Sequence, residues 1–305
     1  MKKIALVALI CCLSLSFEAK GQAGYPPDID GANEVTYKTI NGSELSLWVF
    51  SPENHKSTHT VPAIVFFFGG GWSAGSPTQF VKHCEYLSAR GMVAIVADYR
   101  VKSRHGVLVK DCVSDAKSAI RWVREHAGDL GIDSNRIAAG GGSAGGHLAA
   151  ASAILPNFDD ENEDKSISSK PNALVLFNPA LVLAPIDGIE TPSNERLARL
   201  EKRMGTKPEN MSPYHHVVSA LSPTIIFHGT NDKTVPFVSV ELFTQQMHKF
   251  GNTCTMVAYN GEGHGFFNYG RKSNALFVDT VHKMDEFLVA LGYLEAPPEA
   301  VITAN

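Results

Sequence analysis

The chain has 305 residues, of which 44% are hydrophobic and 19% are charged, and its formal net charge is −4. This balance suits a folded protein with a sizeable core, and it excludes the strongly basic surface that binds nucleic acid or anionic membranes. No interior apolar run is long enough to span a bilayer, so we expect neither a nucleic acid partner nor a membrane span.

The first 23 residues have the pattern of a secretory signal peptide. A positively charged start precedes an apolar segment over 4–15, and small and polar residues follow it. We therefore expect cleavage near the end of this segment and a secreted or periplasmic mature protein. A lipoprotein anchored through Cys11 or Cys12 is the less favoured alternative, because bulky Ile10 stands where a small residue is expected.

Residues 24–305 are expected to form one α/β domain. The predicted strands cover 35–40, 45–50, 63–68, 92–97, 137–139, 173–177, 224–227 and 253–257, and the predicted helices cover 77–90, 111–127, 144–155, 237–250 and 274–291. Asn41-Gly42 between the first two strands is a hairpin signal, which predicts an antiparallel N-terminal edge. Buried strands that alternate with helices indicate a mostly parallel central sheet with helices on both faces.

Two stretches interrupt this alternation. Residues 179–223 are long and irregular, with one short charged helix predicted over 194–204. Because ligands of open α/β sheets bind beyond the carboxyl ends of the strands, we expect this region to be a lid-like insertion near the substrate. Residues 157–165 are strongly acidic, and we interpret them as a solvated loop rather than a metal site.

Two Gly-x-Ser-x-Gly motifs compete for the role of nucleophile, one around Ser143 and one around Ser73. Ser143 stands directly between a predicted strand and a predicted helix. Flanking glycines tolerate the strained turn that projects a serine hydroxyl above the edge of a sheet. Choosing Ser143 also gives the triple glycine 69–71 a function, since its amides and that of Ala144 can donate hydrogen bonds to an oxyanion. The sequence therefore favours Ser143.

A serine nucleophile needs a histidine base, and that base needs an orienting carboxylate. For this motif the chain order is serine, acid, histidine. Asp232 follows the predicted strand 224–227, and His264 follows the next strand, so both side chains are expected in loops beyond strand ends. We predict Asp232 and His264 as the partners of Ser143.

Other acids, histidines and aromatic residues have weaker claims. The rival carboxylates are Asp187, Glu190 and Glu262, and the rival imidazoles are His147 and His228, for which packing or loop hydrogen bonds are the favoured interpretation. Residues proposed to contact substrate are Trp72, Tyr214, His215 and Phe266, with His216, Phe267 and Tyr269 as further candidates.

Three cysteines remain after removal of the signal peptide. In an oxidising compartment one disulfide and one buried thiol is a reasonable arrangement. Cys84 and Cys112 fall on neighbouring predicted helices and are the preferred pair, while three buried thiols, Cys254 included, are the alternative. No spacing of cysteines and histidines suggests a metal, and we expect no cofactor. The oligomeric state is left open.

Together these motifs resemble those of the α/β-hydrolase superfamily, and specifically the hormone-sensitive-lipase and acetyl-xylan/feruloyl esterase-like (BD-FAE-like) carboxylesterases. The matching segments are 68–72, 98–100, 141–147, 228–232 and 263–266. The resemblance implies Ser143, Asp232 and His264 as the catalytic triad, and the oxyanion hole is implied to consist of the amides of Gly70, Gly71 and Ala144. Phe68 departs from the family pattern, which has histidine before the glycines, so we expect this loop to be held differently.

The expected activity is hydrolysis of an external ester through an acyl-enzyme. Family analogy points to short-chain or carbohydrate-linked esters, such as acetyl or feruloyl groups on plant-type polysaccharide. A prolyl-oligopeptidase-like serine peptidase is the alternative from the same fold, although the chain before the first buried strand is too short for the propeller such enzymes carry. A non-catalytic binding module is disfavoured because all three triad residues are present.

Overall fold

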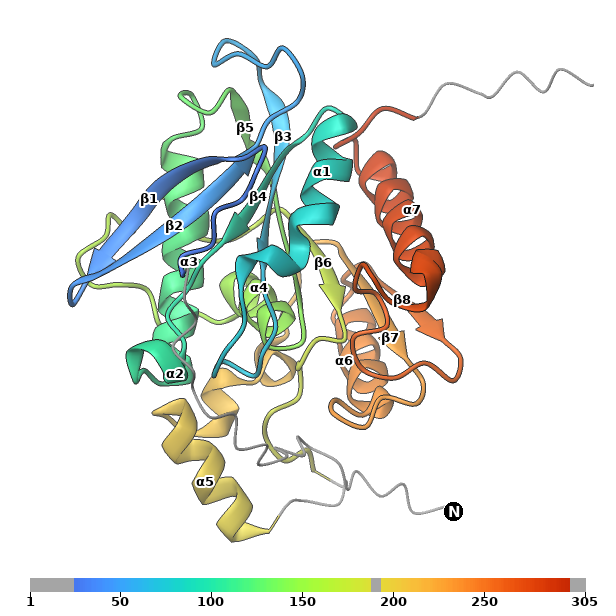
Figure 1. Ribbon diagram of the computed structural model, residues 1–305. Helices are drawn as coiled ribbons and strands as arrows, with labels where there is room; N and C mark the ends of the chain where they lie inside the picture. Colours follow the sequence, from blue (N-terminus) through green and yellow to red (C-terminus); the bar gives the residue numbers. More distant parts are fainter. Residues whose placement is uncertain (1–24, 188–192, 297–305) are drawn as a thin grey trace, which may run out of the picture.

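The computed structural model describes residues 25–187 and 193–296, so the predicted signal peptide lies outside the described residues. An eight-stranded sheet crosses the molecule in the order β1-β2-β4-β3-β5-β6-β7-β8 (Figure 1). The strands are β1 Asn33–Ile40, β2 Ser43–Phe50, β3 Val61–Phe67, β4 Val93–Ala97, β5 Ile132–Gly142, β6 Ala173–Phe177, β7 Thr224–Gly229 and β8 Cys254–Tyr259. β1 pairs antiparallel with β2 and β2 with β4, and all other pairs are parallel. The predicted fold class, with its antiparallel N-terminal edge, is confirmed.

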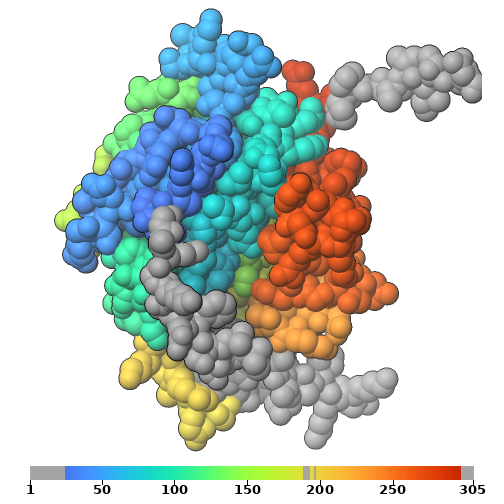
Figure 2. All heavy atoms as spheres, in the orientation of Figure 1, coloured from blue at the N-terminus to red at the C-terminus, as the bar shows by residue number. Residues whose placement is uncertain are grey.

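Helices cover both faces of this sheet. They are α1 Val81–Ala89, α2 Lys102–His105, α3 Val109–Glu125, α4 Ala144–Ile154, α5 Asn194–Met204, α6 Phe237–Lys249 and α7 Ala275–Ala290, with short 3-10 helices η1 Pro77–Phe80, η2 Pro208–Met211, η3 Pro213–His216 and η4 Lys272–Asn274. α1 and α7 contribute to one apolar cluster and α3, α4 and α6 to the other. Figure 2 shows α1 and α7 side by side on one face, with α5 projecting at the bottom. Because both faces are covered, every residue of β4 and β6 is buried, which explains their continuous apolar sequence.

Local sequence explains two boundaries. In the hairpin turn, Asn41 has φ 51° and Gly42 has φ 76°, the two positive values that an Asn-Gly turn accommodates readily. β5 extends beyond the predicted 137–139 because the glycines after it continue the strand. A Cβ on Gly140 would lie 2.6 Å from the Phe66 ring, so close packing between β5 and β3 requires glycine there.

The predicted disulfide between Cys84 and Cys112 is wrong. Cys84 lies on α1 and packs in the cluster on one face of the sheet, whereas Cys112 lies on α3 in the cluster on the other. Both thiols are free and fully buried, and the thiol of Cys254 is also free and buried. Burial raises the pKa of all three thiols. The central sheet therefore separates the pair that the order of the helices had suggested.

The acidic stretch is ion-paired rather than simply solvated. Asp159 lies 2.7 Å from the Lys117 ammonium and also pairs with Arg121, two cations of α3 that are themselves buried. Asp160 forms an ion pair with Lys38 of β1, with 2.8 Å between Lys38 Nζ and Asp160 Oδ2. The loop thus attaches α3 and the edge hairpin to the end of α4.

A buried histidine makes the stability of the fold sensitive to acid. His83 of α1 is fully buried among aromatic rings, with centroids 4.8 Å from Phe80 and 4.9 Å from Phe277. Neither ring nitrogen has a hydrogen-bond partner among the described residues. Burial lowers the pKa of His83 to about 3, so between pH 6.5 and 3 the unfolded chain takes up a proton that the folded chain does not. Stability is therefore lost as the pH falls through this range.

We expect His83→Leu to raise the free energy of unfolding at pH 7.5 by about 1 kcal/mol, because it removes unpaired buried polar atoms. It should also remove about 2 kcal/mol of the stability loss between pH 7.5 and pH 5. Urea unfolding at both pH values measures both effects. His282→Leu, on an exposed part of α7, is the matched control and should leave the difference unchanged. An equal loss in wild type and His83→Leu would contradict the prediction.

Candidate active site

Ser143 lies at a tight turn between β5 and α4. Its backbone has φ 54° and ψ −115°, a strained conformation for a residue with a side chain. A Cβ on Gly145 would lie 2.0 Å from the Phe67 carbonyl oxygen, and one on Gly141 would lie 2.5 Å from the Gly145 carbonyl carbon. Only glycine fits at these two positions, so they allow α4 to start directly against β3 and raise Ser143 above the sheet edge.

His264 and Asp232 come together from the loops after β8 and β7. His264 Nδ1 lies 2.7 Å from Asp232 Oδ2, and Asp232 Oδ1 accepts the backbone N–H groups of Thr234 at 2.8 Å and Val235 at 2.9 Å. Asp232 is only 5% exposed, and burial alone would raise its pKa. A hydrogen bond and a Coulombic attraction from His264, together with the hydrogen bond from the Val235 N–H, outweigh the effect of burial and hold the pKa of Asp232 below its usual value. An ionised Asp232 fixes the proton of His264 on Nδ1 and leaves Nε2 as an acceptor.

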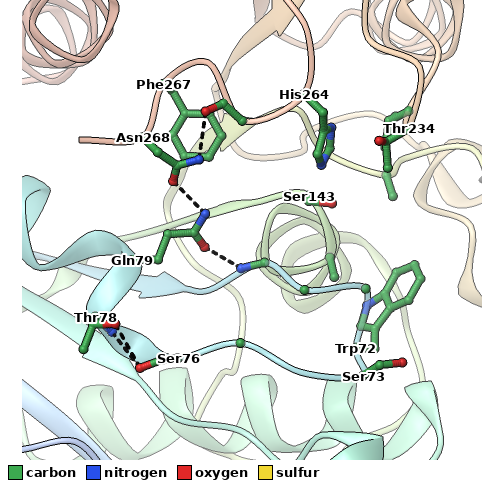
Figure 3. Close-up of a pocket in the computed structure, with 18 of the residues that line it drawn as sticks. Trp72, Ser73, Ser76, Thr78, Gln79, Ser143, Thr234, His264, Phe267 and Asn268 are labelled. Carbon is green, nitrogen blue, oxygen red and sulfur yellow. Dashed lines mark hydrogen bonds between the residues drawn. The ribbon is translucent and has the colours of Figure 1, made fainter. Parts of the chain in front are cut away.

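Ser143 and His264 line one pocket of about 610 Å³. Figure 3 shows the His264 ring directed across this pocket toward Ser143. Ser143 Oγ has no hydrogen-bond partner among the described residues, and catalytic hydrogen bonds commonly tighten only when substrate binds. The volume is in the usual range for a small-molecule site.

A glycine-rich loop forms the wall opposite His264. Gly70 has φ 122° and Gly71 has φ 59°, both in the region that favours glycine. These two residues and Ala144 at the start of α4 line the pocket, and their backbone N–H groups have no acceptor among the described residues. Unpaired amides beside a helix N-terminus form a site for a negatively charged oxygen.

The family model BD-FAE matches residues 47–247, which include the glycine loop, Ser143 and Asp232. The chain belongs to the BD-FAE family.

Relatives of this BD-FAE protein are esterases. Esterase LipC of Mycobacterium tuberculosis is 28% identical over 249 residues, which cover 74% of this chain and 60% of LipC. Acetylxylan esterase of Xylanibacter ruminicola is 26% identical over 248 residues, covering 77% of this chain and 46% of that protein. The chain spans about half the length of the curated relatives it matches.

Solved structures give a fuller match. A thermophilic esterase from Thermogutta terrifontis, Est2, is 50% identical, with a TM-score of 0.87 over 92% of this chain and 99% of that one. The BD-FAE protein therefore has the α/β-hydrolase fold of these esterases over nearly all of its described residues.

Ser73, the rival serine, borders the same pocket, but its hydroxyl and its backbone N–H already have hydrogen-bond partners. Its hydroxyl accepts a hydrogen bond from Arg203 of α5 at 3.1 Å, and its backbone N–H closes a turn on the Gly70 carbonyl at 3.1 Å. Arg203 also donates to the Gly71 carbonyl. The insertion thus contacts the glycine loop through α5.

The other two rival imidazoles contact backbone carbonyls. His228 Nε2 lies 2.9 Å from the Val235 carbonyl and 3.4 Å from Asp232 Oδ2, behind the contact of His264, and burial lowers the pKa of His228. His147 Nδ1 accepts the indole N–H of Trp72 at 3.2 Å, while its Nε2 lies 2.8 Å from the Met211 carbonyl. Burial lowers the pKa of His147 to about 4, so the ring is neutral and donates through Nε2. His147 therefore holds the indole of Trp72, which lines the pocket, through this hydrogen bond.

Of the rival carboxylates, Glu262 pairs with Lys272 at 2.5 Å, and Glu190 lies outside the described residues.

Of the four predicted substrate contacts, only Trp72 borders the pocket. Phe266 is buried in the core, 4.5 Å from the Tyr259 ring, and His215 lies 2.9 Å from the Pro185 carbonyl. Tyr214 packs against the apolar cluster on the other face of the sheet. Phe266 is close to His264 in the sequence, and Tyr214 and His215 belong to the insertion, but none of the three lines the pocket.

Several pocket residues were not predicted. Among them are Gln79, Asn268, Arg203 and Arg271. Each is a single polar residue without a motif around it, so the sequence carried no signal for it.

The described residues contain no group of three or more His, Cys, Asp or Glu side chains that could hold a metal ion. None of their helices has both the length and the apolar character that a membrane span requires.

Proposed function

We propose that this chain is a secreted serine carboxylesterase that hydrolyses short-chain or carbohydrate-linked esters. The observation that carries the proposal is the 2.7 Å contact between His264 and Asp232 at a pocket that also contains Ser143 on its strained turn. Phosphylated forms of the Thermogutta terrifontis esterase, with tabun, sarin and paraoxon, show that this related protein has a reactive nucleophile, and we extend that property to Ser143.

In the proposed mechanism, Ser143 attacks the ester carbonyl while His264 Nε2 takes the hydroxyl proton. Asp232 holds the imidazole in orientation and stabilises its positive charge. The amides of Gly70, Gly71 and Ala144 donate to the oxygen that becomes negative, and each such donor is typically worth about 3 kcal/mol. His264 then protonates the leaving alcohol, and water deacylates the enzyme by the same steps in reverse order.

The acyl group is proposed to be small. The residues that line the pocket together with Ser143 include glycines, Ala144, Ala180 and Phe267. Est2 of Thermogutta terrifontis has been solved with propionate and with butyrate bound. These observations support acetyl to butyryl groups, and feruloyl is the larger acyl group that remains to be compared in the same assay.

A second hollow supports a sugar as the alcohol. It has a volume of about 420 Å³ and shares Gln79 and Asn268 with the catalytic pocket. Its surface includes Tyr269, which is 52% exposed, and the carboxylates of Asp28 and Asp30. An exposed aromatic ring covers the apolar face of a sugar, and carboxylates accept hydrogen bonds from its hydroxyl groups. The acetylxylan esterase relative agrees with this substrate class.

Export is part of the proposal and rests on the pattern of residues 1–23. A secreted or periplasmic enzyme meets polymeric esters that do not enter the cell.

The test compares 4-nitrophenyl acetate, acetylated xylo-oligosaccharides, methyl ferulate and a prolyl anilide, with enzyme recovered from outside the cytoplasm after expression of the full chain. We expect turnover of the acetyl esters and none of the anilide. Tyr269→Ala should raise KM for the acetylated oligosaccharide several-fold and leave 4-nitrophenyl acetate unchanged, because only the sugar reaches the second hollow. Phe250→Ala, which removes another exposed aromatic ring, is the control and should change neither KM.

Cleavage of the anilide alone would indicate a peptidase, and no turnover of any substrate would indicate a binding module. Equal KM values for the oligosaccharide in wild type and Tyr269→Ala would contradict the sugar assignment while leaving ester hydrolysis intact.

A further inference from the structure

A chain of side-chain hydrogen bonds joins the glycine loop to the histidine loop (Figure 3). Gln79 Oε1 accepts the Gly69 N–H at 2.6 Å, and Gln79 Nε2 donates to Asn268 Oδ1 at 2.9 Å. Asn268 Nδ2 then donates to the Gly265 carbonyl at 2.8 Å. The two ends of the chain are the immediate neighbours of Gly70 and of His264.

The orientation of both amides is fixed by these ends. Gly69 offers an N–H, so Gln79 must present its oxygen there and its nitrogen to Asn268. Gly265 offers a carbonyl, so Asn268 must present its nitrogen there and its oxygen to Gln79. The two requirements agree at the bond between Gln79 and Asn268, so every link is satisfied in a single arrangement.

The same glutamine also lies against the turn that holds Ser143. A Cβ on Gly142 would lie 3.5 Å from Gln79 Nε2, and a Cβ on Gly69 would lie 3.4 Å from Ser143 Cβ. Gln79 therefore hydrogen-bonds the glycine loop directly, lies near Gly142, the residue before Ser143, and reaches the histidine loop through Asn268. It comes from η1, whose first turn is capped by Ser76.

Phe68 fixes the start of the glycine loop. Where the family pattern has histidine, the Phe68 ring is buried and stacks on Tyr99 with centroids 4.2 Å apart, and the Tyr99 hydroxyl donates to the Phe68 carbonyl at 2.8 Å. These contacts hold the start of the loop. Beyond it, Gly70 and Gly71 have no side chains, and the loop is held through its backbone: the Gly70 carbonyl accepts the Ser73 N–H, the Gly71 carbonyl accepts Arg203, and Gln79 holds the Gly69 N–H. Glycine has wide conformational freedom, so these backbone contacts set the direction of the amides.

We propose that Gln79 and Asn268 are positioning residues that keep the amides of Gly70 and Gly71 in register with Ser143 and His264. The proposal rests on the proposed ester hydrolysis, because register matters only if these amides stabilise an oxyanion. Donors that are already in place cost no reorganisation when charge develops, and displacement of a reacting group by about 1 Å can cost about 100-fold in rate. Gln79 and Asn268 need not touch the substrate to act in this way.

The test replaces Gln79 with methionine, which has a similar length and bulk but neither donates nor accepts these bonds. We expect kcat for 4-nitrophenyl acetate to fall between 10- and 100-fold, with KM within about threefold of wild type. Binding of phenylboronic acid, whose serine adduct places a negative oxygen on the amides, should weaken by the same factor as kcat/KM. Gln245→Met, on an exposed part of α6, is the matched control and should have wild-type kinetics.

Asn268→Leu breaks the chain at its second link and covers the case in which Gln79→Met fails to fold. The double variant should lose no more activity than the worse single variant, because one break already uncouples the two loops. Three results would overturn the proposal: kcat within twofold of wild type in either folded variant, a loss confined to KM, or losses that multiply in the double variant. Ser143→Ala in the same assay separates the two levels, since an active Ser143→Ala enzyme refutes the ester mechanism itself.

Discussion

Replacing Ser143 with alanine is expected to lower kcat for 4-nitrophenyl acetate by about 10⁵- to 10⁶-fold. In the proposed mechanism the Ser143 hydroxyl, on the strained turn between β5 and α4, forms the acyl-enzyme and gives its proton to His264 Nε2. The residual rate over water would come from binding and from the amides around the pocket. Stopped assays at high enzyme concentration measure this residual rate, and the far-ultraviolet circular dichroism spectrum checks that the variant is folded.

The neighbouring motif supplies the comparison. Ser73→Ala removes the other candidate hydroxyl and leaves the hydrogen bond from Arg203 to the Gly71 carbonyl in place. We expect it to lose no more than about tenfold. His264→Ala introduced into the Ser143→Ala enzyme should add little further loss, because the two residues act as one unit. A Ser143→Ala enzyme more active than Ser73→Ala would reverse the assignment of the nucleophile.

Replacing Gly145 with alanine is expected to destabilise the protein by at least about 4 kcal/mol, or to prevent folding. Alanine is favoured over glycine inside a helix by about 1 kcal/mol. Its Cβ, however, would lie 2.0 Å from the carbonyl oxygen of Phe67 and 2.5 Å from that of Phe68. Phe67 ends β3, a central strand paired on both sides, and Phe68 follows it directly, so these atoms cannot move without disrupting the sheet. The collision outweighs the helix preference.

Gly128→Ala is the matched control. A Cβ there meets no atom within 4 Å, and the residue does not have a positive φ, so we expect a change of no more than about 1 kcal/mol. Urea unfolding and the yield of soluble protein measure both variants. A Gly145→Ala protein within 1 kcal/mol of wild type would show that α4 can move away from β3.

The sequence was informative where one local pattern determined the structure. Parallel strands that are buried on both faces appear as continuous apolar runs, so their positions were predictable, as at 173–177 and 224–227. The loops that follow such strands lie at one edge of the sheet, which is why Asp232 and His264 could be proposed together. Both inferences need only the chain direction and the period of the strands.

Contacts between distant segments were not predictable in this way. Gln79 and Asn268 are 189 positions apart and carry no motif, so nothing in the chain pairs them. The Cys84–Cys112 pair failed because consecutive helices in an α/β protein can cover opposite faces of the sheet. The acidic loop was predicted, but its ion pairs were not, because composition does not reveal that Lys117 and Arg121 lie beside it.

The three thiols have a consequence for how the protein matures. Because these thiols are free, buried and partly separated by the sheet, the part of the chain that the structure describes requires no oxidation step to reach its native state and can form in a reducing compartment. Their burial also shields them from alkylating reagents while the chain is folded. The rate at which iodoacetamide labels them thus reports global opening, without any added probe.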